Sequence, residues 1–397
     1  MNLKERGVPG VSGPFRIVFI VVLAALFSLD SRAETQSAAP TESTSILLNP
    51  VKRRDWVRLW ESNILSDARN RYCDREMGEE IGWMMTPFVD GFYEGYLATH
   101  ETSWIDRLVD WTDAWVKRGV KEPDGCIGWP KAGAASTDID NLRAFNTDSF
   151  LGEAMLLRPI VLMSAEILRD PALKQKYGAK AQGYLKLSTE IYQKWDARGC
   201  WRETADGGMI SVVLPYGLDA ATGQWTTGYA NRNAAGQGFS HPNNKANIVA
   251  CWLLAMSDAT GQPVYRERAA RWFRILKSRM KVKADSNTYV IWNYWEPAGA
   301  WDGKPNGSPK HWVGVHPNAG YYEIDAEGIV EAYEHGVVFT KEDIDRLIAT
   351  ALAEKRYWGA LAPYNAEIQK RVEQTLKPDS WGCLSAAPAL LLREMRK

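Results

Sequence analysis

The chain has 397 residues, 45% of them hydrophobic, which is enough to build a large core in one or two domains. Lys and Arg together number 48, as do Asp and Glu, so the formal net charge is zero. A near-neutral surface provides no long-range attraction for nucleic acid or for an anionic membrane, and we expect neither as a partner.

The first 33 residues have the pattern of a secretory signal peptide. Three basic residues precede an apolar run over 17–29, and small residues at 31 and 33 occupy the positions that a signal peptidase reads. The run is too short to span a bilayer comfortably, no later segment is apolar enough, and no Cys follows it to carry a lipid. We therefore expect cleavage after Ala33 and a mature protein in the periplasm or outside the cell.

Residues 34–47 are rich in Ser, Thr, Ala and Pro and predict a flexible lead-in to a single domain over 48–397. Helical periodicity dominates that domain. Four amphipathic helices each follow another apolar helix across a short connector, and these connectors lie at 99–102, 169–172, 259–263 and 336–340. Further helices are predicted over 55–70, 363–374 and 381–396, which brings the count to at least eleven, with few strands.

The connectors carry the chemistry of helix ends. Gly261 and Gly336 suit the left-handed position that ends a helix, and Pro263 suits a first helical turn. Thr340 with Asp343 resembles a capping box. These signals predict four helical hairpins, each built from two antiparallel helices.

Long loops over 125–147, 199–243 and 285–318 separate the hairpins. Hairpins whose long loops emerge on one side predict an all-α fold, an α/α toroid of six or seven helix pairs. In this fold an inner ring of helices lies within an outer ring, and the loops form a cleft over one end. An α-solenoid or an irregular bundle is the alternative.

None of the five cysteines belongs to a CxxC pair, so we predict no zinc site. One or two disulfides could form in an oxidising compartment. Cys251 lies on an apolar helical face and is predicted to be a core residue.

The first loop ends in DNLRAFNTDSFLG, where Asn146, Thr147 and Asp148 precede a helix. Asp148 is a natural N-cap. If this helix end faces the cleft, Asp148 and Asn146 could also contact a ligand.

The second loop ends in TTGYANRNAAGQGFSHPNNKANIV, which is dense in amide, basic and aromatic side chains. Asn243 or Asn244 is predicted to cap the next helix, whose N-terminus favours an anion. Arg232 or Lys245 would strengthen that preference, and a polar surface loop is the alternative.

The third loop contains SNTYVIWNYWEPAGAWDG, with five aromatic rings at Tyr289, Trp292, Tyr294, Trp295 and Trp301. Such rings pack against the apolar faces of sugars while their polar atoms bond hydroxyls. A packed core plug is the alternative. Downstream, His311 and His316 precede a helix that Tyr321 and Tyr322 open.

Over roughly residues 84–352 the chain resembles secreted α/α-toroid polysaccharide lyases that act on uronate polymers such as alginate and glucuronan. The matching stretches are NTDSFLGEAMLLRPIVLMSAEIL, HPNNKANIVACWLLAMSDATGQPVYRERAARWF, YVIWNYW and YYEIDAEGIVEAYEHGVVFTKEDIDRLIATAL. The resemblance implies cleavage of an anionic polysaccharide by β-elimination.

This reaction needs a base for the C5 proton, an acid for the leaving oxygen, and a group that neutralises the uronate carboxylate. Spacing and the resemblance together give Tyr294 the proton transfer, with His241 as second base and Tyr322 as runner-up. Asn244 and Arg232, with the helix end, would neutralise the carboxylate. A phenol titrates near ~10, so this role requires adjacent positive charge to lower the pKa of Tyr294. The remaining predicted substrate-binding residues are Tyr229, Asn243, Lys245, Trp292, Trp295, His311 and Asn146.

Three other functions stay open. A glycoside hydrolase on the same toroid would use paired carboxylates, for which Asp148, Glu296 and Asp325 are available. A C5-epimerase would return the proton from the other face of the sugar. A secreted sugar-binding protein would need only the aromatic rings.

No cofactor and no metal ligand set are predicted, because no pair of His residues has helical ligand spacing. A divalent cation held by His241, His311, His316 and Asp302 is the alternative.

Overall fold

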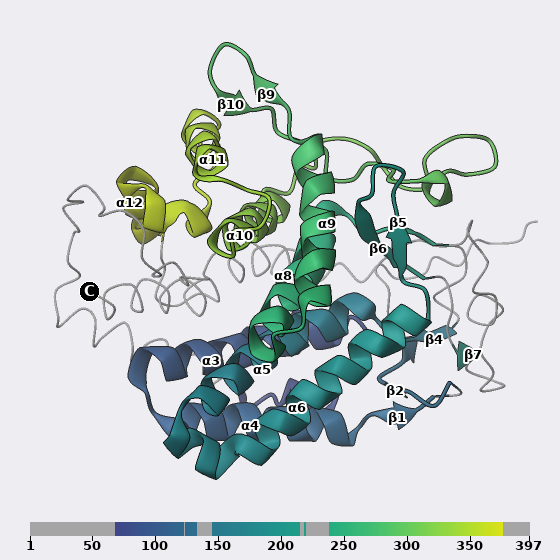
Figure 1. Cartoon of the computed structure of the whole chain (residues 1–397), viewed down its shortest axis with the longest axis vertical. Helices are drawn as coiled ribbons and strands as arrows, with labels where there is room; N and C mark the ends of the chain where they lie inside the picture. The colour runs from purple at the N-terminus through teal and green to yellow at the C-terminus, as the bar shows by residue number, and fades with distance from the viewer. Residues whose placement is uncertain (1–67, 123, 133–144, 215–217, 220–237, 376–397) are drawn as a thin grey trace, which may run out of the picture.

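The computed structural model describes residues 68–122, 124–132, 145–214, 218–219 and 238–375 (Figure 1). The predicted signal peptide, the lead-in, most of the helix over 55–70, the helix over 381–396 and Cys383 lie outside the described residues.

Four helical hairpins form the described part of the fold, as the sequence predicts. They are α3 (Thr86–Thr99) with α4 (Thr102–Lys117), α5 (Phe150–Arg169) with α6 (Pro171–Ala197), α8 (Asn243–Thr260) with α9 (Pro263–Arg279), and α10 (Gly320–Glu334) with α11 (Lys341–Ala353).

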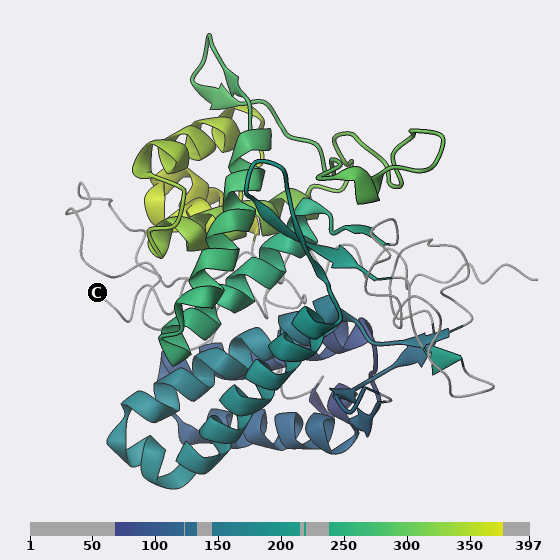
Figure 2. The same ribbon diagram turned by 45° about the vertical axis from the view of Figure 1, so that its right-hand side comes forward.

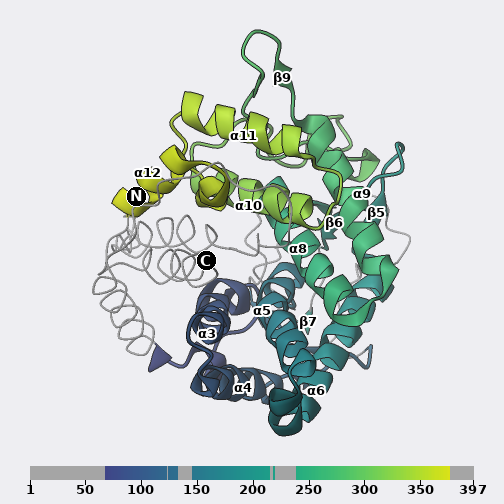
Figure 3. The ribbon, with the colours of Figure 1, turned by 60° about the vertical axis from the view of Figure 1, so that its left-hand side comes forward.

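The hairpins are arranged as two concentric layers around a common axis (Figure 3). Helices α3, α5, α8 and α10 pack against one another in that order, and α4, α6, α9 and α11 lie outside them. Nearly every residue of α5 and α8 is buried, whereas α4 buries a single stripe that includes Trp104, Trp111 and Trp115. This difference in burial is what an inner and an outer layer require. The all-α toroid is therefore confirmed, and the total of six or seven pairs stays a prediction.

The short connectors have the predicted chemistry. Gly261 and Gly336 adopt φ values of 69° and 62°, in the left-handed region that suits glycine. Asp170 caps α6 by accepting hydrogen bonds from the backbone N–H groups of residues 172 and 173. Thr340 and Asp343 form the capping box of α11. Local sequence thus fixes where each hairpin turns.

Short helical segments complete the fold. A 3₁₀ turn, η1 (Tyr72–Asp74), and a π-helical turn, η2 (Ile81–Met85), lead into α3, and a 3₁₀ turn η4 (Ala300–Asp302) lies in the third long loop. The helix predicted over 363–374 is found as η5 (Gly359–Tyr364) followed by α12 (Ala366–Thr375). Asn365 separates these two elements, and its side chain accepts hydrogen bonds from the N–H groups of residues 367 and 368.

All strand pairs in the described residues are short and antiparallel, and they lie in the connections between the hairpins. The pairs and three-stranded sheets are β1 (Val120–Lys121) with β2 (Ile127–Gly128); β3 (Lys131–Ala132), β4 (Phe145–Thr147) and β7 (Leu218–Asp219); β5 (Trp201–Glu203), β6 (Met209–Val213) and β8 (Phe239–Ser240); and β9 (Val282–Lys283) with β10 (Thr288–Tyr289). Figures 1 and 2 show strands β1 to β8 and η4 on the same side of the helices. The inner helices begin at this end of the ring, so their N-termini meet the long loops.

The thiols of Cys73, Cys126, Cys200 and Cys251 are all free, and Cys251 is buried as predicted. Within the described residues, then, no disulfide forms. In the same part of the chain, no helix has both the length and the hydropathy needed to cross a bilayer.

Candidate functional site

Backbone hydrogen bonds fasten the third loop to the starts of α8 and α10. The N–H of Asn243 donates to the carbonyl of Tyr294 over 3.1 Å, and the N–H of Tyr294 donates to the carbonyl of Gly314 over 2.7 Å. The N–H of His316 donates to the Tyr322 hydroxyl over 2.8 Å. Two of the long loops therefore meet where two inner helices begin.

Four partly exposed rings gather at this junction, and we call Tyr294, His311, His316 and Tyr321 the ring cluster. Tyr294 and Tyr321 stack with centroids 5.0 Å apart, and the ring of His316 lies 4.9 Å from Tyr294 and 4.6 Å from Tyr321. His311 lies 5.9 Å from Tyr294. The predicted proton carrier is thus held between other rings while part of its surface stays open.

Burial raises the pKa of Tyr294 above its usual value, and the neighbouring groups Tyr321, Asp325 and Glu79 raise it further. The sequence analysis required positive charge to lower the pKa of Tyr294, and this expectation is wrong. Burial of Tyr294 outweighs any positive charge that the described residues supply. The Tyr294 phenol is therefore protonated at neutral pH, which leaves it the role of proton donor and not that of base.

His241 is 3% exposed, and its Nδ1 shares a 2.9 Å hydrogen bond with the Ser211 hydroxyl. Burial, helped by the positive charge of Lys245, lowers the pKa of His241 to about 3. The imidazole is consequently neutral. In the tautomer in which Nδ1–H donates to the Ser211 hydroxyl, Nε2 is the nitrogen that can accept a proton.

An ion pair between Glu79 and Lys245 lies beside both groups. The Lys245 ammonium is 2.8 Å from Glu79 Oε1, which also accepts a 3.0 Å hydrogen bond from the Trp83 indole. The charge of Lys245 lowers the pKa of His241 and His311, and the charge of Glu79 raises that of Tyr294. The sequence analysis missed Glu79, because a lone acidic pair before a helix carries no motif.

Asn243 and Asn244 do not cap α8 with their side chains: the N-cap position is Pro242, and no side chain caps the helix. Asn243 is fully buried, donates to the carbonyl of Asn293 over 2.9 Å and accepts from Arg279 over 2.7 Å. It fastens the third loop to α8 and α9, so the predicted contact with substrate is wrong for Asn243.

Asn244 is 1% exposed, and its Oδ1 has no hydrogen-bond partner among the described residues. An unpaired buried amide costs free energy, and coordinates assign its O and N atoms from the surrounding hydrogen bonds. Exchanging the O and N assignments would place the NH₂ group, which an anion requires, at the position of the unpaired oxygen.

Three predicted sugar-contacting rings are instead core residues. Trp292, Trp295 and Tyr322 are 3%, 0% and 1% exposed. The Trp292 indole donates to Asp325, the Trp295 indole to the carbonyl of Ser240, and the Tyr322 hydroxyl to the carbonyl of Trp292. The faces of these rings are packed against protein, so they cannot stack on a sugar. The Tyr322 hydroxyl is bonded to the Trp292 carbonyl, so Tyr322 is not the proton-transferring residue.

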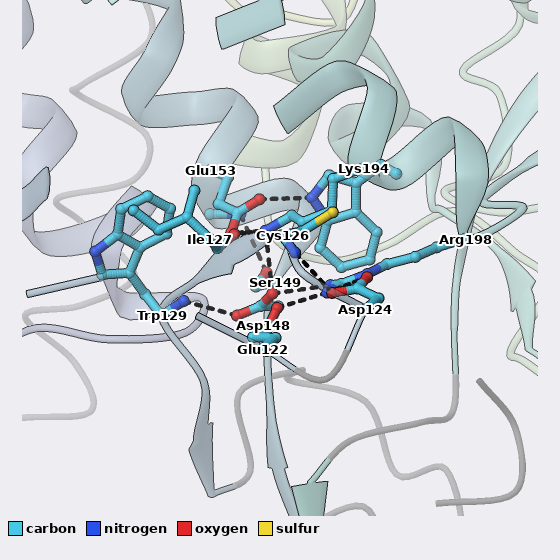
Figure 4. A network of polar contacts seen from close by, with 12 residues as sticks. Glu122, Asp124, Cys126, Ile127, Trp129, Asp148, Ser149, Glu153, Lys194 and Arg198 are labelled. Carbon is cyan, nitrogen blue, oxygen red and sulfur yellow. Dashed lines mark hydrogen bonds and ion pairs between the residues drawn. The ribbon is translucent and has the colours of Figure 1, made fainter. Parts of the chain in front are cut away.

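A buried charge network joins the two ends of the first loop to α5 and α6, and we define it as Glu122, Asp124, Asp148, Glu153, Lys194 and Arg198 (Figure 4). Asp148 accepts from the N–H of Trp129 over 2.8 Å and lies 3.0 Å from the Lys194 ammonium and 2.8 Å from the Arg198 guanidinium. The N-cap of α5 is Ser149, not Asp148. Asp148 is therefore a structural carboxylate.

The other predicted carboxylates are also engaged. Asp325 is buried and accepts from the Trp292 indole over 2.8 Å and from the Asn247 amide over 2.7 Å. Asp302 is buried and accepts from the Ser240 N–H and hydroxyl, each over 2.7 Å. Glu296 accepts from the Asn293 amide over 2.7 Å.

Two candidates, Arg232 and Tyr229, lie outside the described residues. Asn146 lies in β4, opposite Ala132 and Leu218. Within the described ranges, no three His, Cys, Asp or Glu side chains group as metal ligands would. Both carboxylate oxygens of Asp302 accept hydrogen bonds from Ser240, so this buried carboxylate is stabilised without a cation.

No family model and no curated protein matches the chain. Among solved structures, it is similar to the GH76A α-1,6-mannanase of Salegentibacter sp. HEL1_6, at 12% identity and a TM-score of 0.47, over 86% of this chain and 98% of that one. It is also similar to a glycosyl hydrolase family 88 protein from Bacteroides vulgatus, at 12% identity and a TM-score of 0.41, over 86% and 98%. A third is "a possible member of GH105 family" from Klebsiella pneumoniae subsp. pneumoniae MGH 78578, at 12% identity and a TM-score of 0.40, over 91% and 99%. Similarity at this level gives no information on the reaction.

Proposed function

We propose that this protein is an exported enzyme that acts on a polysaccharide, and that it is a lyase cleaving a uronate polymer by β-elimination. The observation that carries the proposal is that a protonated phenol, a neutral buried imidazole and an amide with an unpaired oxygen lie around the start of α8, where the charge of Glu79 acts on both the phenol and the imidazole. These are Tyr294, His241 and Asn244.

In the proposed reaction His241 Nε2 takes the C5 proton of the uronate. The C5–H electron pair becomes the C4=C5 double bond, the C4–O4 bond breaks, and O4 takes the proton of the Tyr294 hydroxyl. Proton exchange with water then restores both groups. A neutral imidazole and a protonated phenol are the starting states that this sequence requires.

The uronate carboxylate must be neutralised before its neighbouring proton becomes acidic. Asn244, at the N-terminal end of α8, could donate its amide N–H to that carboxylate, and the helix dipole adds positive potential there. Lys245 contributes positive charge at the same end of the helix. It is paired with Glu79, and its charge still lowers the pKa of His241. Arg232 remains a predicted partner of the carboxylate.

Hydrolysis on the same toroid is the second candidate. The observation in its favour is that burial raises the pKa of Asp325 to about 7, a value suited to a general acid. Against it, Asp325 is 2% exposed and bonded to both Trp292 and Asn247, and inverting hydrolysis needs a second carboxylate roughly 6.5–9.5 Å away with room for water. The carboxylates that the sequence offered are engaged in structural contacts.

One screen tests the proposal. The purified protein is incubated with alginate, glucuronan, pectate and glycosaminoglycans, and both near-ultraviolet absorbance and new reducing ends are measured. A lyase yields both together, because elimination leaves a conjugated double bond. New reducing ends without absorbance would establish hydrolysis, and unchanged chain length with altered C5 configuration would establish epimerisation. Adding a chelator tests the cation alternative, and sequencing the N-terminus of exported protein tests cleavage after Ala33.

A further inference from the structure

The segment 312–315 is the most exposed apolar stretch near the ring cluster. Trp312, Val313 and Val315 are 49%, 41% and 45% exposed. Burying a half-exposed indole is favourable, so its exposure at this place calls for an occupant. The segment has no place in the proposed chemistry, because the reacting groups there are Tyr294 and His241.

The Trp312 ring is supported from one side. A Cβ placed at Gly314 would lie 2.6 Å from Trp312 Cζ2, so the indole rests against the backbone of residue 314 in a space that only glycine leaves open. Gly314 has a φ of 155°, which favours glycine on conformational grounds as well. One part of the ring is thus held against protein while about half of its surface faces outward.

This supported ring is tied directly to the candidate site. The carbonyl of Gly314 accepts the N–H of Tyr294 over 2.7 Å. The edge of Trp312 meets His316 at a centroid distance of 5.8 Å and an interplanar angle of 82°, and His316 in turn lies 4.9 Å from Tyr294. The indole therefore sits one ring beyond the proton donor.

The chain directly after this segment is held in place by hydrogen bonds. His316 donates its N–H to the Tyr322 hydroxyl and accepts the N–H of Asn318 on Nδ1 over 3.0 Å. The Asn318 side chain accepts the N–H of Gly320, the first residue of α10. Little ordering is then needed when a ligand binds.

We infer that Trp312 is a sugar-binding platform, which stacks on a unit of the polymer next to the glycosidic oxygen that Tyr294 protonates. The inference rests on the proposed function for its substrate class and adds that the enzyme binds several sugar units at once. An indole that packs against Gly314 and leaves about half of its surface exposed can stack on the apolar face of a pyranose ring. The platform takes the role that the buried Trp292 and Trp295 cannot fill.

The test compares wild type with Trp312→Ala and Trp312→Phe, and with Val282→Ala as an exposed apolar control on β9. Retardation of each protein in gels containing alginate, glucuronan or pectate measures binding without requiring chemistry. We expect Trp312→Ala to lose roughly three- to tenfold in affinity for the polymer that retards wild type, Trp312→Phe to retain most of it, and Val282→Ala to match wild type. Where the wild type forms product, KM for that polymer should rise by the same factor in Trp312→Ala, with kcat little changed.

The outcomes separate the two proposals. Loss of retardation in Trp312→Ala, with no unsaturated product from wild type, would keep the platform and reject the lyase. Product from wild type, with retardation and KM unchanged in Trp312→Ala, would reject the platform and keep the lyase. Absence of wild-type retardation by every polymer tested, or an apolar segment that instead mediates self-association in sedimentation and leaves retardation unaltered in the Ala variant, would overturn the inference.

Discussion

The charge network at the start of α5 and the ring cluster at the starts of α8 and α10 occupy equivalent places in the fold. Both lie where long loops meet the N-termini of inner helices. In the network, Asp148, Lys194 and Arg198 have side chains no more than 1% exposed, and each is bonded within the network. In the ring cluster, Tyr294 and its neighbours are half-open, and nearby Asn244 has an unpaired amide oxygen.

This difference in burial and pairing distinguishes structural residues from candidate functional residues more clearly than residue type does. Both regions are rich in the groups that catalysis uses, and the sequence makes Asp148 and Tyr294 comparable candidates. The network's charges are paired and its Glu122 oxygen without a hydrogen bond is sealed from solvent, so a ligand cannot reach it, whereas the polar groups at the start of α8 lie near partly open rings. The four predictions that follow test that contrast.

The largest effect is expected from Tyr294→Phe. Removing the proposed proton donor should lower the rate of product formation by about 10³-fold or more, while the thermal midpoint of unfolding stays within a few degrees of wild type. The matched control is Tyr289→Phe in the same loop, where the lost hydroxyl bonds the buried Asp343 over 2.8 Å. That variant should lose some stability and keep its activity; a Tyr294→Phe enzyme that keeps its rate would remove Tyr294 from the reaction.

In the charge network, Lys194→Met should act on stability. It leaves Asp148 and Glu153 buried without the ammonium that lies 3.0 Å and 2.6 Å from them, which we expect to cost about 3–5 kcal/mol of unfolding free energy. Lys180→Met is the control, because its pair with Asp113 is about half exposed and should be worth less than ~1 kcal/mol. Equal denaturant midpoints for the two variants would show that the network does not stabilise the fold.

Asn244→Ala and Asn243→Ala should separate the two neighbouring amides. Losing the unpaired Asn244 amide should reduce kcat by roughly 10²-fold with little change in stability, as expected for a donor that acts on developing charge. Losing Asn243 breaks its bonds to Arg279 and Asn293 and should lower stability first. Kinetics and chemical denaturation on both variants test this, and the reverse assignment of effects would contradict the proposed role of Asn244.

The smallest effect concerns the pH dependence of stability. Burial, and the negative charge of Asp148, raise the pKa of Glu122 from 4.5 to about 9, while Lys194 and Arg198 oppose the shift. The folded protein thus holds a proton that the unfolded chain releases, so this contribution is complete below pH 4.5 and is lost as the pH rises toward 9. Asp124 pairs with the same Arg198 guanidinium over 3.0 Å, and the lowered pKa of Asp148 acts in the opposite sense at acidic pH.

Glu122→Gln cannot release that proton, so its unfolding free energy should fall less than that of wild type over the same pH interval. Denaturant unfolding at several pH values measures the slope. Parallel slopes for the two proteins would mean that Glu122 is ionised in the folded state.

The helical hairpins were predictable because their signals are local. Gly261, Pro263 and the Thr340–Asp343 box act within one or two turns of the chain, and the structure has each of them as the sequence predicts. The caps of α5 and α8 were less predictable. Several adjacent polar residues could each have capped these helices. Asp148 and Asn243 instead form hydrogen bonds with residues more than 18 positions away in the chain.

The site was predictable in its location and less so in its members. Asn243, Tyr294 and His316 come together at the starts of inner helices, where the long loops were expected to meet. Residue type and neighbours do not distinguish the open Trp312 from the sealed Trp292 and Trp295, because all three stand among similar residues. Glu79 was missed because its partner Lys245 is 166 positions away.

By itself, the sequence determined the hairpins, their turning points and the all-α class, since periodicity and capping act over a few residues. Only the tertiary structure decided which polar groups are satisfied and which rings are open. Those properties depend on contacts between segments far apart in the chain, such as Lys194 with Asp148 or Gly314 with Tyr294. The residue type determines the chemistry of a side chain, but the elements that pack around it determine how deeply it is buried.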